Sequence, residues 1–357
     1  MASERSILVG NVAVGGGAPV SIQSMCNTPT QDVEKTVSQI LKLEEAGCQI
    51  IRVAVPDMAA ADAVRDIVER IHIPLVADVH FDWRLAVRAA ERGAHALRVN
   101  PGNIGGQQNV RRVADAARAH HVPIRVGVNA GSLEKELLEQ YGPTPEALVQ
   151  SALSHLKMLE DAHFYDAAVS IKASDVRTTV EANLLMAKQS GVPLHIGVTE
   201  AGTKKMGIVK SAAGLGALLL SGVGDTMRVS LTDDPIEEVR AAKDILRAVG
   251  LRRDGVEVVS CPTCGRTQID LAAIAEEVNR RVESIDVPMT VAVMGCVVNG
   301  PGEARHADVG MAGGKDAAVL FRKGEIVRTV RGDTELIVNE LMDEVMKTAR
   351  ELSKRKQ

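Results

Sequence analysis

The feature that most constrains the fold of this chain is a unit that occurs eight times within residues 20–250. Each copy begins with a short run rich in β-branched residues and continues with a stretch in which apolar residues recur at helical spacing. The eight runs cover residues 20–25, 50–56, 74–80, 96–102, 123–129, 167–174, 193–202 and 226–231. Eight such units, about thirty residues apart, predict a (β/α)8 TIM barrel, whereas an open doubly wound sheet rarely needs so many regular units.

Two segments lie outside these units. Residues 7–14 are apolar around a central Gly10–Asn11, which predicts a hairpin that plugs the bottom of the barrel. At the other end, the polar sequence LRRDG after Gly250 predicts a linker. The sequence beyond it predicts a strand (256–260), a helix (269–284), a strand (289–295), a hairpin (317–330) and a final helix from Asp333. We therefore predict two domains, 1–250 and 251–357, the second a small α/β domain with an antiparallel or mixed sheet.

Composition and charge argue against two classes of protein. A net charge of -4 and an aromatic content of 2% supply neither the positive field nor the stacking surface of a nucleic-acid binder. Eighteen apolar residues never run together, and the first residues lack the apolar core of a secretory signal. We therefore predict a cytoplasmic protein that does not enter a membrane. In that reducing compartment, five cysteines indicate metal or redox chemistry rather than structural disulfides.

The carboxyl ends of the strands carry the chemistry of a TIM barrel, and here those ends are polar. Residues two or four apart in one strand face the same side, so five cations are expected at the barrel mouth: Arg52, Arg98, Arg125, Lys172 and Arg228. The other polar residues there are Gln23, Asp78, His80, Asn100, Asn129, Ser174, His195, Thr199, Glu200 and Ser230. Crowded cations repel one another unless an anion neutralises them, and guanidinium groups suit phosphate oxygens. The pattern predicts a substrate that carries two phosphates.

Two alternatives bear on these charged residues. Each arginine could simply pair with a carboxylate at the barrel rim, but Asp78 and Glu200 are the only acidic residues in the set. Glu200 is the candidate general acid or base, in reach of a phosphate-bearing substrate. The alternative for Glu200 is a structural ion pair with Lys172 or Arg228.

Three cysteines of the second domain have metal-ligand spacing. Cys261 and Cys264 lie in the sequence SCPTCG, and Cys296 follows after a helix-length gap. A zinc site needs a fourth ligand, which His306 could supply. An iron-sulfur cubane with one oxygen-ligated iron is equally compatible, because Glu303 lies seven residues past Cys296. A redox cysteine pair is a third possibility, and spacing leaves all three open. Cys26 and Cys48 belong to the barrel, and we assign neither to a metal.

Seven longer stretches carry a specific resemblance: ADVHFDWRLA, LRVNPGNIG, IRVGVNAGSLEK, VSIKASDV, GVTEAG, SCPTCGRTQIDL and GCVVNGPGEA. They closely resemble the bacterial 4-hydroxy-3-methylbut-2-enyl diphosphate synthase family, also called GcpE, and the resemblance runs from about residue 5 to residue 345. It implies a TIM-barrel domain (1–250) that binds the substrate. It also implies that the second domain (251–357) binds an iron-sulfur cluster and is related to sulfite and nitrite reductase modules.

The resemblance further implies an activity and a cofactor. The family converts 2-C-methyl-D-erythritol 2,4-cyclodiphosphate to 4-hydroxy-3-methylbut-2-enyl diphosphate, a two-electron reductive dehydration with ring opening in non-mevalonate (MEP) isoprenoid synthesis. Its electrons come from flavodoxin or ferredoxin, and its 4Fe-4S cluster is held by three Cys and one Glu. These ligands match Cys261, Cys264, Cys296 and Glu303.

The family's substrate contacts also carry over to positions of this chain. They match Arg52, Arg98, Arg125, Asn129, Lys172, Arg228 and Ser230, and the acid near the substrate matches Glu200. From their places at the strand ends, we add Asp78, His80, Asn100 and Thr199 to the predicted substrate-binding residues. We hypothesise that Glu303 is a weak ligand that leaves its iron when substrate arrives, and that Glu200 helps to protonate the departing hydroxyl.

In this family the cluster domain of one subunit covers the barrel of the other. We therefore predict a head-to-tail homodimer whose active site is shared between subunits. Two rival classes remain. One is a zinc-stabilised barrel of the phosphosugar aldolase or pterin-binding type, and the other is a non-catalytic iron-sulfur electron carrier.

Overall fold

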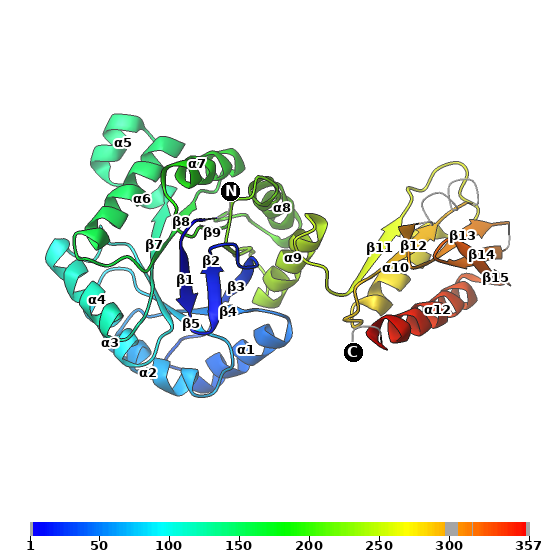
Figure 1. Cartoon of the computed structure of the whole chain (residues 1–357), viewed down its shortest axis with the longest axis horizontal. Helices are drawn as coiled ribbons and strands as arrows, with labels where there is room; N and C mark the ends of the chain where they lie inside the picture. Colours follow the sequence, from blue (N-terminus) through cyan, green and yellow to red (C-terminus); the bar gives the residue numbers. More distant parts are fainter. Residues whose placement is uncertain (1–2, 297–305, 316, 355–357) are drawn as a thin grey trace. The chain divides into compact units, whose positions relative to one another are not determined.

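The computed structural model describes residues 3–296, 306–315 and 317–354. It divides into two compact units, residues 1–252 and 253–357 (Figure 1). The division lies within the polar segment LRRDG that the sequence analysis interpreted as a linker. No described helix is both long enough and apolar enough to cross a membrane.

A barrel of eight parallel strands forms the centre of the first unit. The strands are β3 (Ser21–Met25), β4 (Ile50–Ala54), β5 (Leu75–Asp78), β6 (Ala96–Val99), β7 (Ile124–Asn129), β8 (Ala167–Lys172), β9 (His195–Ile196) and β10 (Thr226–Met227). Their order in the sheet is β8-β7-β6-β5-β4-β3-β10-β9. The two ends of the sheet meet where Val169 forms a parallel bridge with Leu194, and the Val169 N–H donates to the carbonyl of Pro193 at 2.9 Å. The predicted TIM barrel is therefore confirmed.

Helices follow every strand and form the outer ring of the barrel (Figure 1). They are α1 (Val33–Glu45), α2 (Met58–Val68), α3 (Trp83–Glu91), α4 (Gln107–Ala119), α6 (Pro145–Glu160), α7 (Val176–Gln189), α8 (Lys204–Leu220) and α9 (Pro235–Ala248). A turn, η1 (Ala130–Ser132), and a short helix, α5 (Lys135–Tyr141), separate β7 from α6. Aspartates cap the amino-terminal ends of several of these helices. At the start of α2, for example, the Asp57 carboxylate accepts a hydrogen bond from the Ala60 N–H at 2.8 Å.

An antiparallel hairpin covers the amino-terminal end of the barrel, where the strands begin. It consists of β1 (Ser6–Val9) and β2 (Val12–Gly15), and its turn uses Gly10 at a φ of 57°, a conformation that glycine adopts without strain. Its apolar side chains pack against residues from four barrel strands; this cluster contains Ile7, Val9, Val14, Ile50, Val76, Ala96 and Ala168. The hairpin is thus the plug that the sequence predicted, and it leaves the carboxyl ends of the strands open for chemistry.

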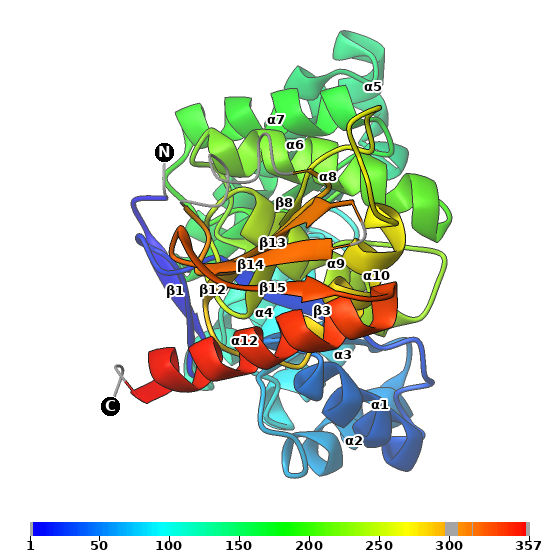
Figure 2. The same cartoon turned by 90° about the vertical axis from the view of Figure 1, so that its right-hand side faces the viewer.

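The second unit contains a mixed sheet of five strands. They are β11 (Val256–Ser260), β12 (Met289–Met294), β13 (Val309–Gly314), β14 (Ala317–Arg322) and β15 (Glu325–Arg331), in that order. The first three strands are parallel, and the last two are antiparallel to their neighbours. Helices α10 (Leu271–Val282) and α12 (Thr334–Lys354) pack on the sheet through a second apolar core, and Figure 2 shows α12 running along it.

The sequence analysis missed strand β13. Its sequence, VGMAGG, contains three glycines and reads as part of a loop. The structure explains one of them, because a Cβ at Gly310 would lie 2.4 Å from the ring of Phe321 on β14. The glycine therefore leaves the space into which that aromatic ring packs.

Candidate active site

The interior of the barrel is charged near the mouth, where branched apolar residues usually fill such barrels. The strand alternation points Asp78, Arg98 and Arg125 inward side by side, since Asp78 pairs in register with Arg98 and Arg98 with Arg125. Asp78 is 3% exposed and both arginines are 6% exposed. Lys172 is buried as well, and the side chains of Arg52 and Arg228 are largely buried. The five predicted cations therefore lie inside the barrel.

Asp78 is the charged centre of one half of this site. Its carboxylate lies 3.7 Å from Arg52 Nε, 3.2 Å from Arg98 Nη1 and 3.4 Å from His80 Nε2. Burial opposes ionisation of Asp78, but the hydrogen bond from His80 and the charges of both arginines outweigh it and lower its pKa. Burial also lowers the pKa of Arg52, to about 10. Asp78 therefore orients two guanidinium groups and one imidazole.

Arg228 has a carboxylate partner that the sequence analysis missed. Glu238 on α9 is 4% exposed, and its Oε2 lies 3.3 Å from both Nε and Nη2 of Arg228. Glu238 also accepts a hydrogen bond from the Leu231 N–H at 3.0 Å. The expectation that Asp78 and Glu200 are the only acids among these cations was therefore wrong. The sequence did contain a signal for this partner: Glu238 lies at helical spacing from the apolar residues Ala242 and Ile245, which form part of the buried face of α9.

Arg125 has no carboxylate partner among the described residues. Its Nη1 donates to Gln23 Oε1 at 2.6 Å, while its buried Nε and Nη2 lack a hydrogen-bond partner in the described structure. Burial and the neighbouring charges of Arg52 and Arg98 lower the pKa of Arg125. The guanidinium still carries its charge near neutral pH, so two of its donor groups are available to an anion.

Lys172 also lacks a carboxylate within the described part of the chain. Its Nζ lies 3.2 Å from Nε2 of His195, and His195 Nδ1 lies 3.4 Å from Thr226 Oγ1. Burial and the surrounding cations lower the pKa values of both Lys172 and His195, which favours a neutral imidazole. Across the described barrel interior, five cations thus face only two buried carboxylates, Asp78 and Glu238. The excess positive charge suits a polyanionic ligand.

Glu200 lies just beyond the end of β9, and its side chain is exposed. Its φ of 52° places it in the left-handed region, which is uncommon for a residue with a side chain and is often found at functional sites. Within the described residues Glu200 forms no ion pair with Lys172 or Arg228, which instead lie against His195 and Glu238. The structural ion pair that was the alternative for Glu200 is therefore not observed.

The remaining predicted contact residues occupy strand ends or the loops that follow them. Asn129 is the last residue of β7 and pairs in register with Lys172. Asn100 is buried, and its Oδ1 accepts a hydrogen bond from the Gly102 N–H at 3.0 Å, so it also shapes its own turn. Thr199 and Ser230 are half-buried. All four lie at or just beyond the carboxyl ends of their strands, and their roles in substrate binding stay predictions.

Strands β11 and β12 bring the cysteine-containing segments of the second unit together. The two strands are parallel neighbours, so Cys261 and Cys296 follow adjacent strand ends. The Gly295 N–H donates to Cys261 Sγ at 3.2 Å, and the Gln268 N–H donates to the carbonyl of Gly295 at 3.2 Å. These bonds tie the two loops to each other.

The three cysteines are free thiols and differ in exposure. Cys264 is exposed, Cys261 is half-buried and Cys296 is buried. Hydrogen bonds from the backbone and the side chain of Arg266 lower the pKa of Cys264, and all three thiols raise the pKa of Arg266, so this cation lies near each of them. Within the described residues, no three Cys, His, Asp or Glu side chains form a ready metal site. The predicted ligand Glu303 lies outside the described residues.

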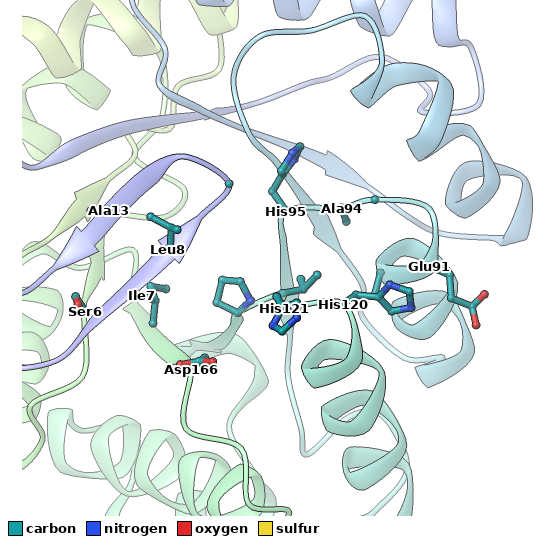
Figure 3. Close-up of a pocket in the computed structure, with 15 residues that line it drawn as sticks. Ser6, Ile7, Leu8, Ala13, Glu91, Ala94, His95, His120, His121 and Asp166 are labelled. Carbon is teal, nitrogen blue, oxygen red and sulfur yellow. The ribbon is translucent and has the colours of Figure 1, made fainter.

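The described residues also line a cavity of about 710 Å³ beside the β1–β2 hairpin (Figure 3). Three histidines, His95, His120 and His121, contribute to it together with Leu8 and Asp166. It lies where the strands begin, at the end of the barrel away from the cations. No predicted site residue lines it.

Family models match both units of the chain. The model described as the GcpE TIM-barrel domain matches residues 4–243, and the one described as the GcpE protein C-terminal domain matches residues 257–347. At the level of fold alone, dihydropteroate synthases from Yersinia pestis and Stenotrophomonas maltophilia each align with a TM-score of 0.50, at 13% and 17% identity. They cover 70% and 69% of this chain and 100% and 98% of their own.

Full-length relatives are much more similar. A protein of Caldanaerobacter subterraneus subsp. tengcongensis named 4-hydroxy-3-methylbut-2-en-1-yl diphosphate synthase (flavodoxin) is 55% identical, over 97% of this chain and 98% of its own length. A protein of the same name from Geobacter sulfurreducens is 58% identical, over 92% of this chain and 94% of its own. On the strength of these matches along nearly the whole sequence, the chain belongs to the GcpE family.

Proposed function

We propose that this chain converts 2-C-methyl-D-erythritol 2,4-cyclodiphosphate to 4-hydroxy-3-methylbut-2-enyl diphosphate in the MEP pathway. The reaction opens the ring, takes up two electrons and two protons, and releases one water. The observation that carries the proposal is the excess of cations buried inside the barrel, in a chain 55–58% identical to relatives that bear the name of this synthase. Two linked phosphates are the kind of ligand that would neutralise such a group of cations.

The barrel residues divide the work of binding. The unpartnered Nε and Nη2 of Arg125 and the ammonium group of Lys172 bind phosphate oxygens directly. Arg52 and Arg98 are held in place by Asp78, and Arg228 by Glu238, so that these guanidinium groups lose little conformational freedom when the ligand arrives. We further assign substrate contacts to His80, Asn100, Asn129, Thr199 and Ser230.

Glu200 is the proposed acid for the departing hydroxyl. Its exposed side chain and left-handed backbone place it on the loop after β9, next to the strand ends that carry the cations. Because Glu200 is not engaged by Lys172 or Arg228 in the described structure, its carboxyl group is available to hold and deliver a proton.

We propose that Cys261, Cys264 and Cys296, with Glu303, hold a 4Fe-4S cluster. The two loops fit this task because N–H groups point at cysteine sulfurs, as the Gly295 N–H does at Cys261, and hydrogen bonds of this kind stabilise ligated thiolates. When bound, the cluster would supply the two electrons one at a time from flavodoxin or ferredoxin. The five free cysteines fit a reducing compartment, and we place the protein in the cytoplasm.

Replacing Cys296 by alanine tests the cluster and the reaction together. After anaerobic purification, we expect the variant to lose iron, sulfide and product formation, while calorimetry still shows binding of the cyclodiphosphate to the barrel. Cys48→Ala is the matched control, because Cys48 is a buried thiol of the barrel that should leave the iron content unchanged. A wild-type protein that contains zinc without iron or sulfide would contradict the proposal. A wild-type protein that contains the cluster but has no affinity for the cyclodiphosphate would also contradict the proposal.

We also propose a head-to-tail homodimer in which the second unit of one subunit completes the barrel site of the other. The C-terminal face of the barrel supports this proposal, because its loops and first helical turns expose large apolar side chains. Phe81 is 74% exposed, and Met58, Tyr141 and Met206 are also exposed. Exposed apolar residues beside a binding site are one feature of a surface that another subunit covers, and Leu220 at the end of α8, also 74% exposed, shows that such residues occur elsewhere on the barrel as well.

A mixed dimer tests the shared site. Glu200→Gln and Cys296→Ser subunits, each inactive alone, are co-expressed with different affinity tags, and the heterodimer is isolated by two successive purifications. One barrel with an intact Glu200 then faces one intact cysteine set, so we expect about half of the wild-type activity. A purified heterodimer without activity would show that each site is built within one subunit.

A further inference from the structure

Gly127 lies in the middle of β7, among the charged side chains of the barrel interior. It is an inward-facing residue of β7, two residues after Arg125 and two before Asn129. It pairs in register with Ser170 on β8. Its backbone does not require glycine, since its φ is not positive. A glycine in the middle of a strand weakens the strand, and it often marks a place where another group approaches closely.

The group that approaches Gly127 is the guanidinium of Arg98 from the neighbouring strand. A Cβ built on Gly127 would lie 2.3 Å from Nε, 2.5 Å from Nη2 and 2.7 Å from Cζ of Arg98. These separations are far below contact distance, so an alanine and the present guanidinium cannot occupy the site together. Arg98 is held there by the Asp78 carboxylate, 3.2 Å from its Nη1.

The same arrangement recurs two strands further along the barrel. A Cβ on Gly197, just after β9, would lie 2.7 Å from Nζ of Lys172 on β8. In both places, a cation from one strand extends over a glycine of the next strand. A Cβ on Gly197 would also lie 2.7 Å from the backbone carbonyl oxygen of Arg228, so Gly197 makes room for the backbone as well as for a side chain.

We propose that Gly127 is a positioning residue of the diphosphate site: its missing side chain is the space in which the Arg98 guanidinium lies. This inference rests on the proposed function for the identity of the ligand. It follows that alanine at residue 127 displaces the guanidinium from its present place, where its Nη1 lies 3.2 Å from Asp78. The rest of the fold is expected to stay the same, because the atoms that the new methyl group would meet belong to the end of the Arg98 side chain.

The test is a double-mutant cycle between Gly127→Ala and Arg98→Met. Binding of the cyclodiphosphate to each anaerobically purified protein is measured by calorimetry. We expect Gly127→Ala to weaken binding about 10- to 100-fold, with a thermal midpoint within about 5 °C of wild type. We expect the double variant to bind no more weakly than Arg98→Met alone, because the guanidinium that alanine displaces is already gone.

Gly131→Ala is the control from the turn after the same strand, since a Cβ there would meet no atom within 4 Å. It should bind within about twofold of wild type. The inference is overturned if Gly127→Ala binds like wild type, or if the losses of the two single variants multiply in the double variant. Absence of binding by the wild-type protein would instead contradict the proposed function.

A folding defect does not leave the inference untested. If Gly127→Ala fails to fold alone, the variant that combines it with Arg98→Ala is expected to fold, because the shortened residue 98 vacates the space that the new methyl group needs. If Arg98→Ala folds alone and both proteins that carry Gly127→Ala do not, the alanine collides with something other than the guanidinium, and the inference is wrong.

Discussion

Methionine in place of Arg125 is expected to stabilise the ligand-free protein and to disable it. We expect the free energy of unfolding to rise by about 1–4 kcal/mol. We expect the affinity for the cyclodiphosphate to fall about 100-fold or more, as the loss of a buried charge-assisted contact implies. Chemical denaturation and calorimetry on the same preparations measure the two effects.

The two effects have one cause, which is the unpaired charge of Arg125. The side chain is 6% exposed, it donates only to Gln23 among the described residues, and its nearest charged neighbours include the cations Arg52 and Arg98. A buried charge without a counter-charge costs folding free energy, and an apolar side chain of similar size removes that cost. The same unpaired donors are what a phosphate would bind. Stability and function therefore oppose each other at this residue.

Arg111→Met on α4 is the matched control. Arg111 is an exposed arginine on the outer surface of the same barrel, so its replacement should change neither stability nor binding by much. A lower free energy of unfolding for Arg125→Met would contradict the argument. It would mean that the hydrogen bond to Gln23 and the packing of the guanidinium outweigh the cost of burying its charge.

The sequence allowed the barrel to be predicted because each strand and each helix carries its own local pattern. The strand ends were less predictable, as β9 and β10 show. The runs 193–202 and 226–231 suggested long strands, yet the regular ladder covers only His195–Ile196 and Thr226–Met227. After those residues the chain leaves the ladder near Gly197 and Arg228, where the charged side chains of the site are packed. Tertiary packing overrode β-propensity there.

The five cations were predictable from alternation along each strand, but their partners were not. Asp78 is close to Arg98 because their strands are neighbours in the barrel, and the barrel order does follow from the eightfold repeat. Glu238 reaches Arg228 from a helix, so no strand pattern points to it. The close approach of the Arg98 guanidinium to Gly127 depends on the conformation of a long side chain, which a sequence does not specify.

Asparagine in place of Asp78 is expected to have the opposite effect on stability to Arg125→Met. We expect the free energy of unfolding near pH 7 to fall by about 3–5 kcal/mol. The substitution keeps the size of the side chain but leaves Arg52 and Arg98 without their carboxylate, and it turns amide donors toward one or the other of these cations. Denaturant unfolding of both proteins measures the difference, and Asp66→Asn, at an exposed carboxylate of α2, should change it by less than about 0.5 kcal/mol.

The pH dependence of that difference identifies its electrostatic origin. The folded protein lowers the pKa of Asp78, so ionised Asp78 contributes its full stabilisation above the ordinary aspartate pKa of about 3.9 and loses it as the pH falls toward the lower, folded value. The gap between wild type and Asp78→Asn should therefore be present at about pH 5 and should narrow below about pH 4. A gap that persists unchanged into acid would mean that Asp78 stabilises the barrel through its shape and hydrogen bonds. The cations of the site would then be held in place by packing, and the electrostatic account of this half of the site would be wrong.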